Sequence, residues 1–507
     1  MATVDAPRSI QAALSRRYAV PVAVVALLAL SLFERTQQLH AGFWIDEGIS
    51  VGIAHHHWTS IPGLLDQDGS PPAYYMLLSL WVQLFGDSER ATHTLSLVFG
   101  LACVPLAFVA GRALFGRGTG LVCALLAALD PYLTYYAQET RMYELEAFLS
   151  LVVAYAYVQG IVRGRRRWAV VLVPAIDLAV YTHNWALFLC VGLAAATVAF
   201  VRERLRLFAL VAAAVAVLYL PWLPTLLAQA RHTGAPWATA PSFRDLVLAP
   251  GAVLGGDAVL VAVVLAAAAA LARRLAGEER TIALALATVA GVTVLTAWIS
   301  SQISPAWTTR YFAVAFGPIV LVAARAFVRA ERLGLVALIA VVFLWAGYSV
   351  RDDKENARQI TAALAPSMRP GELVVSTHPE QVPVLRYYLG GGLRWATTLG
   401  PVADPGIFDW RDAVDRLRAA SMRREVDRTI AAVRPGGTFV VVAPVFRDYR
   451  AWKATWTRLV WQRSLAFTGI LERDPRVRLV RHVTTNEIAR KRNYFKPLQA
   501  FLYRRVG

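Results

Sequence analysis

The sequence predicts a helical protein that crosses a membrane several times and carries a C-terminal α/β domain. Hydrophobic residues make up 57% of its 507 residues, whereas soluble domains contain roughly 45–50%. These residues collect in runs that approach the roughly 20 residues needed to span a bilayer. After about residue 350 the long runs stop, and short β-branched runs bounded by Gly and Pro replace them. That change marks the predicted boundary between a membrane domain (1–350) and a second domain (351–507).

Eleven apolar segments are candidates for membrane-spanning helices: 18–36, 91–110, 120–134, 143–161, 168–182, 184–201, 207–224, 255–272, 281–300, 311–328 and 333–349. Short cytoplasmic loops are enriched in Lys and Arg. Six basic connections alternate here with loops that are poorer in cations, so eleven spans and a cytoplasmic N-terminus place all six on one side. The first outer loop (37–90) and the whole tail are then expected outside the cytoplasm.

The tail is predicted to be a small α/β domain. GELVVSTHP (371–379) and GGTFVVVAP (436–444) read as buried strands with amphipathic helices between them. Its 28 Lys and Arg outnumber its 15 Asp and Glu. Because the tail follows many apolar spans, we expect membrane lipids or a lipid phosphate as partners, and no nucleic acid. The last segment, RKRNYFKPLQAFLYRR (490–505), is expected to face solvent or the membrane surface.

Asp46 and Glu47 follow the first apolar run by about ten residues, in the motif FWIDEG. Ionisable groups near a membrane are costly and therefore point to function. A partly buried carboxylate there would suit a general base. The alternative is an ordinary solvated acidic loop.

Asp68 precedes a Ser-Pro-Pro turn and the apolar sequence YYMLLSLWVQLFG, which we expect to form a helix along the membrane surface. Asp68 could cap or close this turn. Its functional alternative is to bind an acceptor hydroxyl or to support Asp46.

Three consecutive histidines, 55–57, invite a metal-site interpretation that we do not favour. Neighbouring residues on a helix point about 100° apart, so three in a row cannot face one ion. We therefore expect no metal cofactor, although a divalent ion is the alternative, and we treat the histidines as an interfacial polar segment.

Arg141 and Arg310 both lie at the outer ends of spans, against the positive-inside pattern. An arginine there could simply extend to lipid headgroups. Its guanidinium could instead hold a phosphate, and we favour this interpretation because both arginines share a side with the acids. His183, in THNW, is a further candidate contact on that side, with a purely structural histidine as its alternative.

The order of these motifs, DEG, DGSPPAYYMLLSLWVQLFGDSER, QETRMYEL and RYF, resembles the lipid-phosphate-sugar-dependent membrane glycosyltransferases of the GT-C fold. The likeness is to the family-39-type enzymes, which include protein mannosyltransferases, aminoarabinose transferases and galacturonosyltransferases. It covers about residues 18–330.

The resemblance implies roles for particular residues. Asp46 matches the family's catalytic aspartate, Glu47 its usual neighbour, and Asp68 a second acid before the Pro-containing turn. Arg141 and Arg310 match positions that hold the lipid phosphate. Their neighbours Tyr143 and Tyr311 are expected substrate contacts, and the resemblance assigns His183 no role of its own.

The expected reaction is an inverting transfer of one sugar from a polyprenyl-phosphate donor to a cell-envelope acceptor, with Asp46 as the base. The rivals are a transporter or flippase of a lipid-linked or anionic solute, and a non-catalytic scaffold. A transporter should hold its polar groups near the bilayer midplane, whereas these motifs gather at one face. The Ala-, Val- and Arg-rich composition is typical of GC-rich bacteria, so we expect the bacterial plasma membrane.

Overall fold

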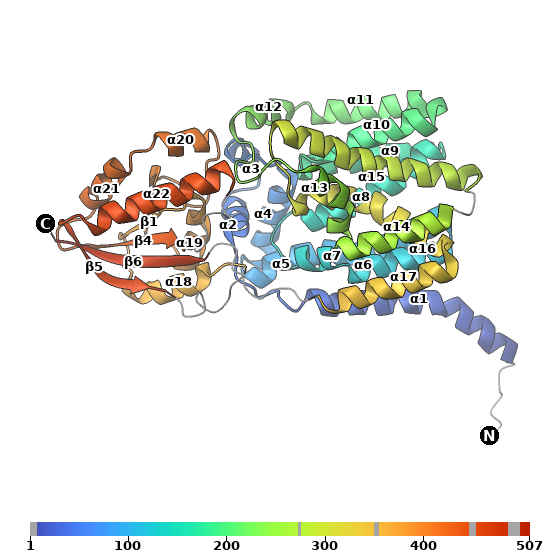
Figure 1. Ribbon diagram of the computed structural model, residues 1–507, viewed down its shortest axis with the longest axis horizontal. Coiled ribbons are helices and arrows are strands. Elements are labelled where there is room, and N and C mark those ends of the chain that lie inside the picture. Colours follow the sequence, from blue (N-terminus) through green and yellow to red (C-terminus); the bar gives the residue numbers. More distant parts are fainter. Residues whose placement is uncertain (1–7, 272–274, 349–353, 446–452, 485–496, 507) are drawn as a thin grey trace, which may run out of the picture.

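In the computed structural model, a helical bundle and a sheet-containing domain lie at opposite ends of an elongated molecule (Figure 1). The structure describes residues 8–271, 275–348, 354–445, 453–484 and 497–506. The described chain starts at the far end of the bundle, and the C-terminus lies at the tip of the sheet domain. Three short helices of the first outer loop, α2 (Ile45–Ala54), α3 (Ile61–Leu64) and α4 (Ala73–Phe85), lie between the two parts.

Each predicted apolar segment contains a helix: α1 (Arg8–Arg35), α5 (Glu89–Phe115), α6 (Arg117–Leu129), α8 (Tyr143–Tyr157), α9 (Arg166–Thr182), α10 (Ala186–Phe200), α11 (Leu205–Tyr219), α14 (Asp257–Leu271), α15 (Gly277–Ile303), α16 (Phe316–Arg329) and α17 (Glu331–Ala346). Within the described residues, five helices are long and apolar enough to cross a membrane. The number rises to seven if two sharply bent helix pairs each count as one span. Eleven spans and a cytoplasmic N-terminus therefore stay predictions.

Shorter helices connect these elements. The ones that matter for the site are α7 (Pro131–Tyr136), α12 (Leu223–His232), α13 (Phe243–Val253) and the 3-10 segment η4 (Thr309–Ala315).

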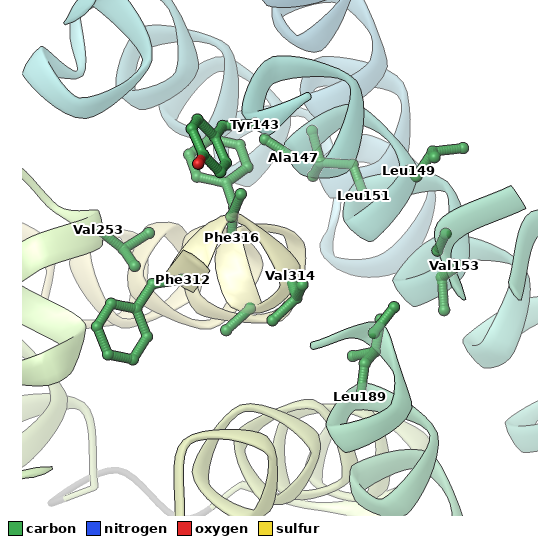
Figure 2. Packing of buried hydrophobic residues seen from close by; sticks show 14 of the residues in the cluster. Tyr143, Ala147, Leu149, Leu151, Val153, Leu189, Val253, Phe312, Val314 and Phe316 are labelled. Carbon is green, nitrogen blue, oxygen red and sulfur yellow. The ribbon is translucent and has the colours of Figure 1, made fainter. Parts of the chain in front are cut away.

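The centre of the bundle is the contact between α8 and the chain that runs from η4 into α16. A side chain at Gly317 would place its Cβ 2.5 Å from the carbonyl oxygen of Ser150, so only glycine allows this approach. The Ser150 hydroxyl donates to the carbonyl oxygen of Val314 (2.7 Å) and accepts from the Gly317 N–H (3.0 Å). Phe316 and Val314 pack beside α8, and Tyr143 sits at its start (Figure 2). This packed contact holds η4, and with it Arg310, in a fixed position relative to α8.

The C-terminal domain is a six-stranded sheet with helices on both faces. Its strand order is β3-β2-β1-β4-β6-β5, with β1 parallel to β2 and β4 and the other pairs antiparallel. Helices α18 and α19 cover one face, and α21 and α22 cover the other. The strands are β1 (Leu373–Ser376), β2 (Arg394–Thr397), β3 (Gly400–Val402), β4 (Thr438–Pro444), β5 (Val477–Val483) and β6 (Leu498–Arg505); the helices are α18 (Ala357–Leu364), α19 (Val382–Leu389), α20 (Ala413–Ala419), α21 (Met422–Ala431) and α22 (Thr455–Glu472).

The expectation that 490–505 faces solvent or membrane was wrong for its second half. Residues 498–505 form β6, which pairs with β4 on one side and β5 on the other. Leu498, Ala500 and Tyr503 are buried in the sheet, so the alternating apolar residues decided the structure and the flanking cations did not. The first part, 490–496, lies outside the described residues.

Helix α2 is the point at which the C-terminal domain meets the membrane domain most closely. A Cβ at Gly48 would fall 2.5 Å from the Cβ of Val384, and one at Gly52 would clash with the carbonyl oxygen of Gly406. Positions 48 and 52 share one face of the helix. Two glycines thus let the domain rest directly on the α2 backbone.

Main-chain hydrogen bonds connect the domain to the other outer loops. The Trp410 N–H donates to the carbonyl oxygen of Gln67 (2.8 Å), and the Trp456 N–H donates to that of Pro236 (3.2 Å). The domain therefore closes over the loops that follow the first helix and α12.

Candidate active site

A cavity of about 530 Å³ lies where the bundle, the first outer loop and the C-terminal domain meet. Six of the eight predicted site residues line it: Asp46, Asp68, Arg141, His183, Arg310 and Tyr311. Glu47 and Tyr143 are not among its lining residues. These side chains come from segments far apart in the sequence, and the fold brings them to one cavity.

Asp46 reaches the cavity from the first turn of α2. Its Oδ2 lies 3.1 Å from Nη1 of Arg310, so the two side chains form an ion pair. The Arg310 guanidinium also lies over the rings of Trp44 (5.4 Å) and Tyr311 (5.6 Å). Two aromatic faces and one carboxylate therefore fix this cation in the cavity wall.

Arg141 connects helix α2 to Asp68. Its Nη1 donates to the Ser50 hydroxyl (2.8 Å) and to the Tyr75 hydroxyl (3.2 Å). Tyr75 in turn donates to Oδ2 of Asp68 (3.3 Å). Burial raises the pKa of Asp68, although Ser70 and Arg141 act in the opposite direction. Asp68 therefore holds its proton to higher pH than an ordinary aspartate.

Both arginines retain donors that nothing in the described chain uses. The Nε atoms of Arg141 and Arg310 are buried and have no hydrogen-bond partner among the described residues. A buried N–H without a partner is costly, so these donors point to an anion that completes the site.

Glu47 turns away from the cavity into a buried cluster. Its Oε1 lies 2.7 Å from Nε2 of His93 and accepts from the Thr140 N–H (2.8 Å). Its Oε2 pairs with Nζ of Lys354 at 3.2 Å. Burial opposes ionisation, but Lys354 and His93 outweigh it and lower the pKa of Glu47 to about 2. The structure thus gives Glu47 no access to the cavity, where a catalytic role was predicted.

The same cluster reaches the cavity wall through Glu139. Lys354 lies 3.7 Å from Glu139, and Glu139 accepts from the indole N–H of Trp44 (2.6 Å). Because Trp44 lies under Arg310, this chain of contacts positions the arginine. Glu139 and Glu47 therefore help to position the cavity wall without lining the cavity themselves.

His183, Tyr143 and Tyr311 form an aromatic group beside the arginines. The His183 ring lies 4.6 Å from that of Tyr311 and 6.1 Å from that of Tyr143. Burial lowers the pKa of His183 to about 3, with Arg141 and Arg310 adding to the effect. Its Nδ1 accepts from the Trp185 N–H (3.1 Å), so His183 is neutral and turns a fixed edge to the cavity. Tyr143 is the member of this group that is buried and does not line the cavity.

The three adjacent histidines bind three separate partners: His55 contacts Asp87 (3.0 Å), His56 contacts Asp404 (2.9 Å) and His57 contacts Thr59 (2.7 Å). Among the described residues, no group of three His, Cys, Asp or Glu side chains could hold a metal ion.

Several residues of the cavity were not predicted from the sequence. The motif SPPAYY contained Tyr75, but nothing in it showed that this hydroxyl would bridge Asp68 and Arg141. Trp237, Gln229 and Trp410 carried no local signal, because each reaches the cavity only through the packing of α12 and the C-terminal domain.

Comparisons with known proteins agree with this architecture. Residues 69–226 match the family model described as dolichyl-phosphate-mannose-protein mannosyltransferase. This match starts directly after Asp68 and includes Arg141 and His183. No curated protein matches the chain.

Solved structures share the fold over most of the chain. ArnT from Cupriavidus metallidurans in the apo state superposes with a TM-score of 0.57 at 16% identity, over 86% of this chain and 94% of its own. The same protein bound to undecaprenyl phosphate gives 0.58 at 14% identity, over 95% and 97%. The archaeal oligosaccharyltransferase AglB from Archaeoglobus fulgidus, in complex with an inhibitory peptide and a dolichol-phosphate, gives 0.55 at 10% identity, over 85% and 70%. The chain therefore has the GT-C fold with a C-terminal sheet domain, as the sequence predicted.

Proposed function

We propose that this protein, a membrane glycosyltransferase of the GT-C fold and the family-39 type, moves one sugar from a polyprenyl-phosphate donor to a cell-envelope acceptor with inversion of configuration. The observation that carries the proposal is the cavity in which Asp46 lies beside two arginines whose buried Nε donors are unused by the described residues. The undecaprenyl phosphate bound to ArnT and the dolichol-phosphate bound to AglB support the choice of donor.

The donor phosphate would bind between Arg141 and Arg310. Each guanidinium offers several N–H groups in a plane, which suits phosphate oxygens. A phosphate bound to Arg310 would weaken the ion pair between Arg310 and Asp46. Donor binding would then leave the Asp46 carboxylate more available as a base.

Asp46 would accept the proton of the acceptor hydroxyl as its oxygen attacks the anomeric carbon. The new carbon–oxygen bond forms while the bond from that carbon to the phosphate oxygen breaks. A single displacement of this kind inverts the anomeric centre. The leaving polyprenyl phosphate is an anion that the two arginines stabilise, so a separate acid is less needed.

Asp68 would position these groups. Its link through Tyr75 to Arg141 makes it a support for the phosphate-binding arginine.

The test is transfer from a panel of labelled polyprenyl-phosphate sugars by purified protein. Asp46→Asn should lower kcat by about 10²–10⁴-fold, the usual contribution of a general base, while polyprenyl phosphate still binds. Asp66→Asn, which changes an exposed acid of the same loop, is the matched control and should change little. Near-normal transfer by Asp46→Asn would exclude it as the base. Activity that a chelator removes and a divalent ion restores would contradict the expected absence of a metal.

A further inference from the structure

The wall of the cavity that the C-terminal domain completes is aromatic. The rings of Trp237 and Trp410 lie 4.6 Å apart at an angle of 56°. Trp410 is supported from behind by Phe408 (4.6 Å) and Trp456 (5.3 Å). Both Trp237 and Trp410 line the cavity. Two large aromatic side chains, of which Trp410 packs on Phe408 and Trp456, therefore form this wall.

Polar atoms without partners belong to the same wall. Gln229 donates from Nε2 to the carbonyl oxygens of Leu65 (2.8 Å) and Ser70 (3.2 Å), and Asn184 donates from Nδ2 to that of Gly69 (3.1 Å). These bonds fix both amide orientations and leave Oε1 of Gln229 and Oδ1 of Asn184 as acceptors. Neither oxygen, nor the indole N–H of Trp237, has a hydrogen-bond partner among the described residues.

This combination suits a sugar ring. The C–H face of a saccharide carries slight positive charge and packs on the negative face of an indole. Hydroxyl groups both donate and accept, so one ring can satisfy two amide oxygens and one indole N–H together. Glu380, on the same side of the cavity, is already bound to His378 and to the indole N–H of Trp456. Among the described residues that line the cavity, the only Lys or Arg side chains are Arg141 and Arg310, which the donor phosphate would occupy, so this wall offers no cation to an anionic sugar. The preferred occupant is therefore neutral.

We infer that Trp237, Trp410, Gln229 and Asn184 bind a neutral saccharide that carries the attacking hydroxyl, so that the acceptor is a glycan or a glycolipid. The inference rests on the proposed function, because it names the acceptor of that reaction. One common way in which a protein binds an extended peptide is to add it as a strand to a sheet edge. None of the described residues that line the cavity belongs to a β-strand, so a peptide acceptor is the less favoured class.

Binding and transfer test the inference separately. Methyl and octyl glycosides of neutral hexoses and pentoses are the probes, with saturation-transfer NMR for binding and a labelled polyprenyl-phosphate sugar for transfer. Trp237→Ala should raise KM for the glycoside roughly ten-fold and leave KM for the donor unchanged, whereas Trp237→Phe should restore part of the affinity, because it keeps an aromatic face and lacks the indole N–H. Trp58→Ala, at a tryptophan of the first outer loop that does not line the cavity, is the control. A preference for octyl over methyl glycosides would assign a lipid-linked saccharide, and equal use a free glycan.

The outcomes separate the two proposals. Transfer to a Ser/Thr-containing peptide and to no glycoside, with Trp237→Ala unaffected, would overturn the saccharide site and leave the glycosyltransferase intact. Glycoside binding that Trp237→Ala abolishes, without transfer from any polyprenyl-phosphate sugar, would support a saccharide site and overturn the proposed donor reaction. Absence of both binding and transfer would overturn both.

Discussion

Arg141 is the residue that connects helix α2 to Asp68. Its Nη1 donates to the hydroxyl groups of Ser50 and Tyr75, while its Nε has no hydrogen-bond partner among the described residues. A lysine keeps the charge but offers one compact ammonium in place of a planar set of donors. Arg141→Lys should therefore raise Kd for polyprenyl phosphate by at least about ten-fold and change KM for the acceptor little.

Direct binding of labelled polyprenyl phosphate to detergent-solubilised protein measures this effect. Arg90→Lys, at an exposed arginine in the first turn of α5, is the control and should bind like the unchanged protein. Equal losses in donor and acceptor use, together with a lower melting temperature, would instead mean that Arg141 is structural.

His183 makes the stability of the protein depend on pH. Its pKa is lowered to about 3 by burial and by the two arginines, against about 6.5 in an unfolded chain. Between these values the unfolded chain binds more protons than the folded one. This contribution to stability is therefore complete above about pH 6.5 and is lost as the pH falls toward 3.

His183→Gln should accordingly show a smaller drop in melting temperature between pH 7 and pH 4.5 than the unchanged protein. His57→Gln, at an exposed histidine, should leave the drop as it is. Identical pH slopes for His183→Gln and the unchanged protein would contradict the assignment.

At the scale of elements, helix α2 presents different faces to different partners. Asp46 and Ser50 face the arginines, Glu47 faces the buried cluster with His93, and Gly52 lies against the carbonyl of Gly406. A change on the glycine face should therefore displace the acid on the other face. Gly52→Ala should lower the melting temperature and reduce transfer, because its new methyl group would clash with the backbone of the C-terminal domain.

Gly63→Ala is the matched control, because a Cβ there meets nothing within 4 Å. It should leave both quantities nearly unchanged. The pair is compared by thermal unfolding and by transfer rate in the same detergent. A Gly52→Ala protein that melts and transfers like the Gly63→Ala protein would show that the domain does not need this close contact.

The same helix shows how far the sequence could predict the site. Neighbouring residues on a helix point about 100° apart, which argued against a three-histidine metal site. The same rotation separates Asp46 from Glu47, so it predicts that only one of these two acids faces the cavity. The apolar runs were enough to predict the bundle helices. The placement of charged residues beside the spans, together with the family resemblance, was enough to single out Asp46, Asp68 and the two arginines, which the structure brings to one cavity. These signals could not reveal Lys354, whose pairing with Glu47 depends on how the C-terminal domain folds back.

For the whole molecule, the chemistry is concentrated at one end of the bundle. The cavity lies where the bundle meets the C-terminal domain, and the connections at the far end hold basic clusters such as RGRRR at 163–167. A lipid-anchored sugar could enter a site so placed from the bilayer and meet an acceptor from the aqueous side. This arrangement agrees with an extracytoplasmic site, which stays a prediction because orientation follows from the charge pattern alone.

Cysteine accessibility tests the orientation directly. Two of the three native cysteines, Cys103 and Cys123, are buried and Cys190 is partly buried, so background labelling should be low. Asp66→Cys and Arg411→Cys should react with a membrane-impermeant maleimide in intact cells, because both positions lie in the part of the molecule that is predicted to face outside the cytoplasm. Arg117→Cys and Arg166→Cys, in exposed basic connections, should react only after the membrane is permeabilised. The opposite pattern would reverse the topology and would place the cavity, with Asp46, on the cytoplasmic side.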